Sequence, residues 1–548
     1  MNTITFPNGK KIAFENEISP EIILHNFDQP SDQIAALRIN NEICSLYQKI
    51  DIDAQIEPVL LNSADGAAIY RRSLCFVLAS AAHNIFPKKR LLVGHSLGHG
   101  YYYTIDGQDS LSDSDLEALK EEMARLIHEN KIIKQKLISY SQAIELFESL
   151  GLVETRKQLN FTCHSKFLIN TLEDFSDLYF GPLVLSTGVL SVYEIMKYHE
   201  GFLLRFPSQK TPEKVEPFED IPKLFSIYNE YKKWGKRLGV TSAASLNELV
   251  TERKTKEFID ITEMLQARQI SKIADQIAAR PEVKLVLMAG PSSSGKTTTS
   301  KKLALQLRCL GYTPKVVELD TYYVERTKTP RDENGDYDYE CLEALDIEQL
   351  NKDLVDMFDG KEVALPTYNF KEGKRYYTGK KIKLEKNDIL IMEGIHGLND
   401  KLTPLIPAEQ KFKIYLSALT QLNLDDHNRI PTSDNRLIRR IVRDSQFRGK
   451  SAADTIKMWP SVQRGERLHI FPFQDKADAF LNTALDYELS VLKVYAIPLL
   501  RCVSPLEREY AEASRLIRFL NNFSQIPVTN VPGQSIIREF VGGSEFKY

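Results

Sequence analysis

The chain has 548 residues, of which 43% are hydrophobic and 26% are charged, and its formal net charge is −3. A chain of this length exceeds what one hydrophobic core usually covers, so we expect two to four domains. The nearly balanced charge gives no overall indication of binding to nucleic acid or anionic membrane. No apolar run reaches the ~18 residues of a membrane span, and the six cysteines stand singly without a CxxC pair. These features predict a cytoplasmic protein with reduced thiols and no membrane contact.

The N-terminal stretch is typical of a small β-rich module. Residues 3–6 and 11–14 are β-prone, and the Asn8-Gly9 pair between them favours a hairpin turn. A short helix is expected near residues 20–27 and a strand at 36–39.

The following region mixes helices and strands as far as residue 207. Residues 73–85 have helical spacing, whereas 91–105 are rich in Gly and Tyr and are expected to form strand and loop. Several prolines between 207 and 222 then indicate a linker, and isoleucines recur at helical spacing up to residue 277. We interpret 208–280 as a helical connector.

From Pro281 onwards short apolar strands alternate with helical segments. The strands are expected at residues 285–289, 315–319, 389–392, 412–416 and 494–500. This alternation favours a parallel sheet covered by helices on both faces.

A phosphate-binding loop follows the first of these strands. Residues 290–297 read Gly-Pro-Ser-Ser-Ser-Gly-Lys-Thr, a full match to GxxxxGK[ST], and residues 298–307 have the pattern of the helix that should follow. We expect the backbone N–H groups to surround phosphate oxygens, Lys296 to reach the β- and γ-phosphates, and the Thr297 hydroxyl to hold Mg²⁺. The predicted nucleotide-binding residues of this loop are Gly290, Ser292, Ser293, Ser294, Gly295, Lys296, Thr297 and Thr298. The alternative is a Gly/Ser loop without a ligand.

Two acidic residues end neighbouring strands of the predicted sheet. Glu393 closes the apolar run 389–392, where it would hold Mg²⁺ or one of its waters, unless it is an ordinary exposed acid. Asp320 follows the strand at 315–319, where it could orient an acceptor hydroxyl and take its proton. From its position alone, Asp320 could equally be an acid that caps a loop.

Four arginines share one face of a predicted helix. Arg436, Arg439, Arg440 and Arg443 are spaced i, i+3, i+4 and i+7, and no acid interrupts them before Asp444. Unpaired guanidinium groups suit a lid that closes over a triphosphate and stabilises charge during transfer. Arg448 extends this basic stretch. Binding of nucleic acid is the competing interpretation of such a stripe.

With these residues in place, the segment 281–505 resembles the uridine kinase and phosphoribulokinase family. The matching motifs, in order, are 290–298, 320–323, 366–370, 393–395 and 436–444 with Arg448-Gly449. The resemblance implies an ATP- and Mg²⁺-dependent kinase in which Asp320 is the catalytic aspartate and the arginine segment is the lid. It thereby implies that Lys296, Arg439 and Arg443 take part in phosphoryl transfer. It implies nucleotide contacts for Arg440 and Arg448. The implied acceptor pocket contains Tyr322, Tyr368 and Arg375.

The chain departs from this family where uridine kinases read the pyrimidine. Gly373 stands where a histidine is expected, Asn369 replaces an aspartate, and Met458-Trp459 replaces a Gln-Tyr pair. Loss of hydrogen-bonding groups changes specificity. A nucleoside or a sugar is therefore the expected acceptor, with uridine itself left open.

The N-terminal half resembles a different family. Residues 1–62 are similar to a TGS domain of threonyl-tRNA synthetases, and 63–207 are similar to the editing domain that follows it. The editing domain's four metal-site or catalytic positions are occupied by Arg72, Phe76, Tyr179 and Leu183. These side chains cannot build a metal or hydrolytic site, so the resemblance implies a retained fold without the chemistry.

We therefore expect the α/β fold class, with a doubly wound parallel-sheet P-loop kinase domain preceded by a β-grasp module and an α+β editing-like domain. The expected domains, with a helical connector before the kinase and a C-terminal extension after it, are 1–62, 63–207, 208–280, 281–505 and 506–548. The expected function is phosphoryl transfer from ATP to a small-molecule hydroxyl. The alternatives are an ATP-sensing regulatory protein that contacts tRNA through its N-terminal half and, less favoured, an aminoacyl-tRNA hydrolase. A homo-oligomer is left open.

His95 and His99 share HxxxH spacing, but the glycines around them break any helix that would place both side chains on one face. An ordinary loop role is therefore expected for this pair in preference to metal binding.

Overall fold

The computed structural model describes residues 1–333, 335, 337–369 and 372–547. The chain folds as two compact units. The first comprises residues 1–253, 421–431 and 497–525, and the second comprises 254–420, 432–496 and 526–548. Two segments of the C-terminal half thus fold with the N-terminal half, which the prediction of a continuous domain over 281–505 did not anticipate.

The first unit begins with the expected β-rich module. Its strands are β1 (Asn2–Thr5), β2 (Lys11–Phe14), β3 (Ile34–Ile39), β4 (Glu42–Cys44) and β5 (Ala54–Leu60), and its helix is α1 (Pro20–Leu24). The sheet order is β2-β1-β5-β3-β4, with β1 and β5 parallel and the other pairs antiparallel. Ile4, Ile23, Leu37 and Ile56 form the centre of its core. The hairpin is confirmed, and the helix is shorter than the expected 20–27.

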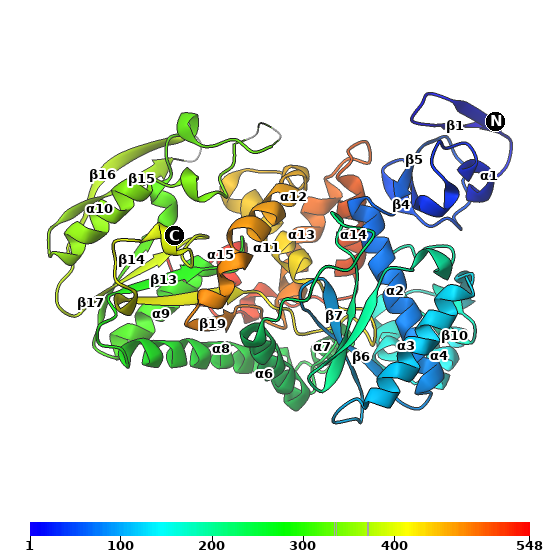
Figure 1. Ribbon diagram of the computed structural model, residues 1–548, viewed down its shortest axis with the longest axis horizontal. Helices are drawn as coiled ribbons and strands as arrows, with labels where there is room; N and C mark the ends of the chain where they lie inside the picture. The colour runs from blue at the N-terminus through cyan, green and yellow to red at the C-terminus, as the bar shows by residue number, and fades with distance from the viewer. Residues whose placement is uncertain (334, 336, 370–371, 548) are drawn as a thin grey trace. The chain divides into compact units, whose positions relative to one another are not determined.

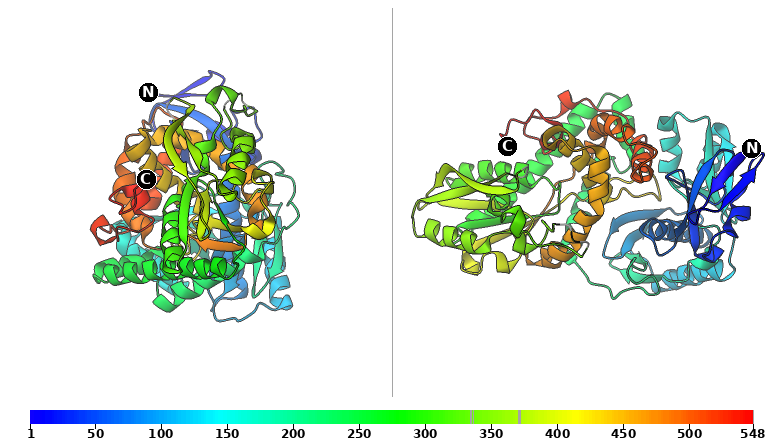
Figure 2. Two further views of the ribbon diagram at one scale, coloured as in Figure 1. Left: turned by 90° about the vertical axis from the view of Figure 1, so that its left-hand side faces the viewer. Right: turned by 90° about the horizontal axis from the view of Figure 1, so that it is seen from above.

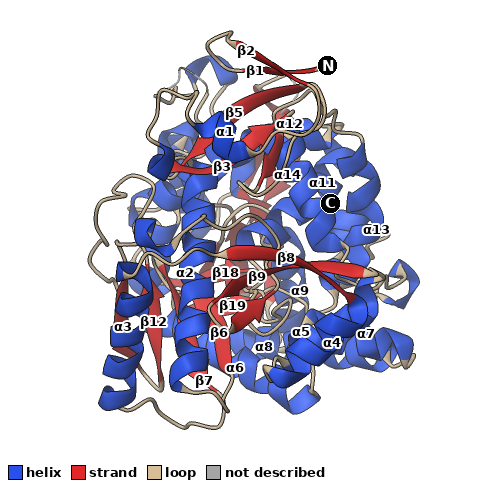
Figure 3. Cartoon of the chain, turned by 90° about the vertical axis from the view of Figure 1, so that its right-hand side faces the viewer, coloured by secondary structure: helices blue, strands red, loops and turns tan. Residues whose placement is uncertain are grey.

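The rest of the first unit has two antiparallel sheets. Its elements are α2 (Ala64–Ile85), β6 (Leu91–Ser96), β7 (Gly100–Ile105), α3 (Asp113–His128), β8 (Lys134–Ser139), α4 (Tyr140–Ser149), α5 (Val153–Thr162), β9 (Lys166–Leu172), β10 (Phe175–Asp177), β11 (Glu194–Tyr198), β12 (Gly201–Arg205), α6 (Pro222–Leu238), α7 (Ala243–Thr251) and α14 (Tyr510–Leu520). The sheet orders are β11-β12-β7-β6 and β10-β9-β8. Helices α2 and α3 pack on the larger sheet through one continuous apolar core (Figure 3). Helix α2 starts earlier than expected because the Ser63 hydroxyl accepts a hydrogen bond from the Gly66 N–H, 3.0 Å away, and caps it.

The second unit is built on the predicted parallel sheet. Its strands are β13 (Leu285–Ala289), β14 (Thr313–Glu318), β17 (Asp388–Glu393), β18 (Lys411–Ser417) and β19 (Ala479–Asn482), in the order β14-β17-β13-β18-β19. All four pairings are parallel. Its other elements are α8 (Thr255–Ala278), α9 (Lys296–Cys309), α10 (Ile347–Phe358), the hairpin β15 (Val363–Asn369) and β16 (Lys374–Ile382), α11 (Thr432–Arg448), α12 (Ala452–His469) and α15 (Arg538–Val541). Helix α13 (Glu488–Arg501) starts in this unit and ends in the other.

Helices cover both faces of this sheet, as a doubly wound fold requires. Leu285 and Leu287 of β13 point to the core shared with α10, whereas Val286 and Met288 point to the core shared with α8 and α9. Helix α8 is the long green helix beside the sheet in Figures 1 and 2. Because every side chain of β13 is buried, the strand is a continuous apolar run rather than an alternating one. The predicted fold class is confirmed.

One predicted strand is wrong. Residues 494–500 belong to helix α13, and β19 is the fifth strand of the sheet. A short apolar run without polar alternation fits a buried strand and a buried helix equally well, and here the segment is helical although it contains Pro498.

No helix in the described part of the chain is both long and apolar enough to cross a membrane.

Candidate active site

The phosphate-binding loop joins β13 to α9 as the sequence predicts. Gly295 adopts φ +81°, a backbone conformation that only glycine reaches without strain, and α9 begins at Lys296. At Gly290 a Cβ atom would meet the Leu416 carbonyl and would lie 2.8 Å from the Ser294 hydroxyl. Glycine is therefore required at Gly295 by the positive φ and at Gly290 by the close approach of neighbouring atoms.

The lysine and the first threonine of the loop lie at the edge of the sheet where the parallel strands end. Lys296 Nζ donates hydrogen bonds to the Gly290 and Pro291 carbonyls, at 3.0 and 3.3 Å, so it folds back over its own loop. The Thr297 hydroxyl donates to Glu393 Oε1 at 2.6 Å. Glu393 is 6% exposed at the end of β17, so the alternative of an exposed acid is wrong. Burial raises the pKa of Glu393 to about 8, while the charge of Lys296 acts in the opposite direction.

The pair of Thr297 and Glu393 fits a magnesium ion. A hydroxyl and a carboxylate are the hard oxygen ligands that Mg²⁺ prefers, and Mg²⁺ bound to nucleotides takes only one or two protein ligands beside phosphates and waters. The described residues contain no group of three or more His, Cys, Asp or Glu that could hold a metal by themselves. A metal here would thus depend on a phosphate ligand, as in a nucleotide site.

Asp320 lies among the cations of the site. It is in a short 3₁₀ turn (Leu319–Tyr322) directly after β14. Burial raises the pKa of its carboxyl, and the charges of Lys296, Arg448 and Arg443 oppose that rise. The structure therefore brings together residues that the sequence placed in three separate motifs.

The arginine helix exists, but its guanidinium groups are not unpaired. Arg436 forms a buried two-pronged ion pair with Glu466 of α12, with Nη2 2.7 Å from Oε2. Asp444, which is 1% exposed, is within ion-pair distance of Arg440 and Arg443, at 3.3 and 2.8 Å. The interpretation as a row of free cations is wrong, because the buried carboxylates of Glu466 and Asp444 neutralise part of it.

Arg439 departs most from the prediction. Its side chain has no exposure and is bound to Glu488 of α13, which is itself buried. Nη1 donates to the Ser293 carbonyl at 3.2 Å and Nη2 to the Thr483 carbonyl at 2.9 Å, and the Phe540 ring lies 5.2 Å from Cζ. The Arg439 guanidinium therefore has all of these partners within the protein, and one of them is a carbonyl of the phosphate-binding loop. Arg440 instead donates to the Ser292 hydroxyl of that loop at 2.7 Å.

The three candidate acceptor residues lie near one another: Tyr368 and Arg375 are paired across β15 and β16, and the charge of Arg375 acts on Tyr322. Tyr322 is fully buried in the core, and its hydroxyl donates a hydrogen bond to Asp353 at 3.0 Å. Arg375 forms an ion pair with Asp346 at 2.7 Å. Tyr368 packs in the core cluster of the sheet, with its ring 5.6 Å from that of Tyr323. Phe370 of the same motif lies outside the described residues.

Two acidic residues of the site were missed by the sequence reasoning. Glu340 is close enough to Asp320, Lys296 and Arg440 to interact electrostatically with all three, and burial raises its pKa to about 7. Glu466 accepts a hydrogen bond from the Ser292 N–H at 3.2 Å besides pairing with Arg436. Nothing in the local sequence marks either one, because each lies outside the motifs that the sequence analysis identified.

A third missed acid comes from the C-terminal tail. Glu539 Oε2 accepts hydrogen bonds from the N–H and the hydroxyl of Thr298, at 3.2 and 2.6 Å. The Ile536 side chain lies against Gly295, where it would be 2.6 Å from a Cβ atom. The tail therefore packs directly on the phosphate-binding loop.

In the first unit, the four substituted editing positions are filled by packing. The Phe76 ring contacts the Tyr179 ring at 5.5 Å, and Leu183 belongs to the same core. Arg72 donates to the Pro182 carbonyl at 2.9 Å, and burial lowers its pKa to about 10. Metal or hydrolytic chemistry has no donor set at these positions.

The two histidines with HxxxH spacing do not share a face. His95 is buried in β6 with its ring stacked on Tyr228 at 5.5 Å, whereas His99 lies in the following turn, 3.6 Å from Glu216.

Comparison with known proteins finds a family match in the C-terminal half of the chain. Residues 285–489 match the sequence model of the Phosphoribulokinase / Uridine kinase family. The match extends from β13 through the phosphate-binding loop, Glu393 and the arginine helix to the start of α13.

The N-terminal part of the chain is similar to threonine–tRNA ligases. It is 28% identical over 200 residues to that of Carboxydothermus hydrogenoformans, which covers 36% of this chain and 31% of the ligase. The ligase of Acidithiobacillus ferrooxidans is 30% identical over 199 residues, with 36% and 31% covered. The chain thus spans about a third of the length of these curated relatives.

Solved structures of kinases also match. One is described as a possible uridine kinase from Bacillus stearothermophilus, with 20% identity, a TM-score of 0.24, and coverage of 39% of this chain and 98% of that chain. Another is a putative fructose transport system kinase from Silicibacter sp. TM1040, with 15% identity, a TM-score of 0.27, and coverage of 38% and 98%.

Proposed function

We propose that the second unit is an ATP-dependent kinase that transfers a phosphoryl group to a hydroxyl of a small molecule, with a nucleoside as the first candidate acceptor. The observation that carries the proposal is the position of Asp320 among Lys296, Arg443 and Arg448 beside the phosphate-binding loop. A base next to cations that bind phosphate is what phosphoryl transfer to a hydroxyl requires.

Each residue has a defined task in this mechanism. ATP with Mg²⁺ supplies the phosphoryl group when bound. The loop N–H groups and Lys296 bind its phosphates, and Thr297 with Glu393 holds the metal. Asp320 orients the acceptor hydroxyl and takes its proton, while Arg443 stabilises the negative charge that spreads over the transferred group.

The acceptor is proposed to carry several hydroxyl groups, as nucleosides and sugars do. Glu340 supports this class because its carboxyl is near Asp320 and Arg440, where it can accept hydrogen bonds from hydroxyls of a bound acceptor. Gly373 supports an acceptor site that does not recognise a pyrimidine base. A Cβ atom there would lie 2.7 Å from the Cβ of Arg326, whose N–H also donates to the Gly373 carbonyl at 2.9 Å. Arg326 thus fills the space that a base-reading side chain would need.

The test is ADP release from ATP and Mg²⁺ with a panel of nucleosides, pentoses and sugar phosphates. We expect one acceptor to stimulate release by the wild type and by the surface control Asp359→Asn, but not by Asp320→Asn. Should ATP bind while no acceptor on the panel stimulates release, the kinase proposal fails. Salt-sensitive tRNA binding without a phosphorylated product would then favour the ATP-sensing regulatory alternative.

A further inference from the structure

The first unit contains a cavity of about 250 Å³ that no step of the proposed kinase uses. It is smaller than the pockets of about 300–1,000 Å³ that hold drug-sized ligands, so it suits a small metabolite. Its walls come from β6 and β7, the start of α5, helix α6, the turn into α7, and the segment 421–431.

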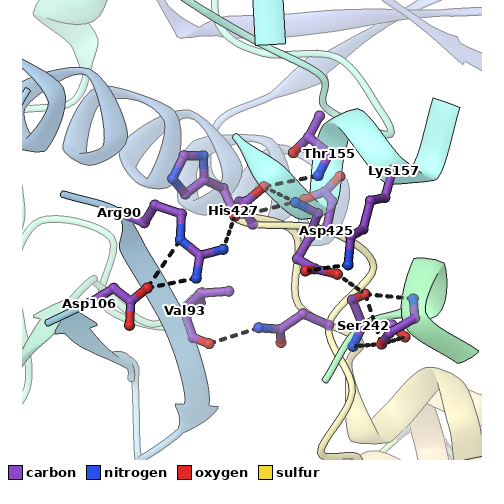
Figure 4. Close-up of polar contacts among 12 residues, drawn as sticks. Arg90, Val93, Asp106, Thr155, Lys157, Ser242, Asp425 and His427 are labelled. Atoms are coloured by element: carbon purple, nitrogen blue, oxygen red, sulfur yellow. Dashed lines mark hydrogen bonds and ion pairs between the residues drawn. The ribbon is translucent and has the colours of Figure 1, made fainter. Parts of the chain in front are cut away.

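The segment 421–431 is fixed firmly to the other walls. The Asn423 side chain donates to the Val93 carbonyl at 2.9 Å, and Asp426 Oδ2 accepts hydrogen bonds from the N–H groups of Glu154 and Thr155, at 2.8 and 2.9 Å. Asp426 thereby caps helix α5 with one of its carboxylate oxygens. Figure 4 shows Arg90 between Asp106 and the segment that carries Asp425 and His427.

One wall leaves a negative charge incompletely satisfied. Asp426 is 2% exposed, and its Oδ1 has no hydrogen-bond partner among the described residues. Arg90 Nη1 is 3.5 Å from this oxygen, but Nη2 of the same guanidinium is held by Asp106 at 2.6 Å. One arginine is therefore shared by two carboxylates, and an oxygen in the cavity wall still lacks a hydrogen-bond donor.

Another wall carries a positive charge that forms no direct ion pair among the described residues, although the charge of Asp106 acts on it. Lys232 of α6 has its Nζ 5.6 Å from the centre of the Tyr228 ring and 5.9 Å from that of Tyr102, and the described residues give it no ion pair. Burial lowers its pKa to about 8, so it is still mostly charged at neutral pH. A desolvated ammonium of this kind is stabilised when an anionic group binds to it.

The charges of the lining nearly cancel. Lys232, Arg90 and Lys236 face four acids, Asp106, Glu154, Asp425 and Asp426. Burial raises the pKa of Asp425 to about 8, which keeps that group largely neutral at pH 7. A simple anion would leave Asp426 unsatisfied and a simple cation would leave Lys232 unsatisfied. A ligand with both charges satisfies the two walls and keeps the cavity neutral.

We propose that this cavity binds a small zwitterion of amino-acid size, with its acidic group at Lys232 and its ammonium group at Asp426. The site belongs to the first unit and does not depend on the kinase proposal.

The test is isothermal titration of the full chain with each of the proteinogenic amino acids, beside acetate and ethylamine as probes with a single charge. We expect at least one amino acid to bind at least tenfold more tightly than either single-charge probe. Lys232→Met should abolish that binding, and Asp426→Asn, which keeps an acceptor for the α5 N–H groups, should weaken it. The neighbouring exposed Lys233→Met is the control and should bind as the wild type does. The proposal is overturned if no amino acid binds, if a single-charge probe binds equally well, or if Lys232→Met binds unchanged.

A second inference comes from the C-terminal tail of the second unit and rests on the proposed function. The tail is held in place by contacts beyond Glu539. Arg538 Nη2 donates to the Val528 and Val531 carbonyls at 3.0 and 2.7 Å, and the Ser535 hydroxyl is 3.2 Å from the Tyr487 hydroxyl. The Glu539 carboxylate therefore lies at the N-terminal end of α9 as part of an ordered segment.

A carboxylate in this place uses the groups that a phosphate would need. The Thr298 N–H and hydroxyl are in the first turn of α9, where the helix dipole favours an anion. We propose that residues 526–547 restrain the kinase by competition, with Glu539 occupying part of the nucleotide's phosphate position until the tail moves away.

The test is the affinity for ADP and ATP, measured by titration without an acceptor. Glu539→Gln should bind both nucleotides about tenfold or more tightly than the wild type, since it loses the charge-assisted contact. Glu545→Gln, another acid of the tail that bonds to Gln534 instead, should bind as the wild type does. Equal or weaker binding by Glu539→Gln overturns the competition alone. If the wild type, Glu539→Gln and Glu545→Gln all fail to bind nucleotide, both the competition and the kinase proposal are overturned.

Discussion

Replacement of Glu488 by glutamine isolates the buried ion pair that supports the phosphate-binding loop. Arg439 has no exposed surface, and Glu488 is 2% exposed. Besides Arg439, the Glu488 carboxylate accepts a hydrogen bond from the Asn435 side chain. In Glu488→Gln the guanidinium stays buried without a counter-charge, next to the Ser293 carbonyl that it holds.

The magnitude follows from what such a pair costs to break. Removal of one partner of a buried pair destabilises a protein by about 3–5 kcal/mol, and glutamine keeps one acceptor, so we expect about 3 kcal/mol. For a unit of this size that corresponds to a fall in Tm of roughly 6–12 °C. Arg439→Met should cost less, because the remaining carboxylate, whose pKa is already raised by burial, can take up a proton.

The assay is scanning calorimetry of the second unit's transition in the full chain, with ADP affinity measured in parallel. A fall in Tm together with weaker ADP binding would agree with a supporting role for the pair. A Tm within about 2 °C of the wild type in Glu488→Gln would refute the reasoning, because it would mean that the charge of Arg439 is balanced elsewhere. A second result would also refute it: Arg439→Met with unchanged Tm and ADP affinity but no turnover. A residue that acts on the transferred phosphate behaves in this way.

Three further predictions concern other parts of the molecule. Arg443→Met should lower kcat by about 10²–10³-fold, with a change in Tm of only a few degrees, because the side chain pairs at the edge of the site; stopped-assay kinetics and calorimetry check this. Gly290→Ala should abolish ADP binding in a titration, since its Cβ would meet the Leu416 carbonyl. In the first unit, the folded-state pKa of Asp425 is about 8, above its unfolded value, so the folded state binds the extra proton and its stability falls as pH rises from about 4 to 8. Urea unfolding at several pH values should show this fall, at most about 1.4 kcal/mol per pH unit, and Asp425→Asn should flatten it.

The sequence was sufficient for features that local chemistry dictates. The loop at 290–297, the strands that end at Glu393 and before Asp320, and the hairpin at the N-terminus each depend on residue types within a short window, and the structure contains all of them. Turn glycines, apolar runs and helix starts are determined by neighbours in the chain, so a single sequence reveals them.

Features that depend on distant partners could not be predicted in this way. Arg436 and Arg439 looked free because their partners, Glu466 and Glu488, lie 30 and 49 residues away. The burial of Tyr322 could not be predicted either, because its ring packs in a core formed by residues far along the chain. The inclusion of residues 421–431 in the first unit has no local sign at all, because a loop that packs elsewhere has the same composition as a solvated one.

The most direct test of the central claim is a single-turnover measurement of phosphorylated product with the acceptor found on the panel. The wild type should convert bound ATP into ADP and phosphorylated acceptor, whereas Asp320→Asn should bind ATP with unchanged affinity and form product at least about 10²-fold more slowly. Product formation by Asp320→Asn at the wild-type rate would contradict the assignment of the base. If the wild type binds ATP and the acceptor but forms no product, the second unit is not a kinase for that class of molecule.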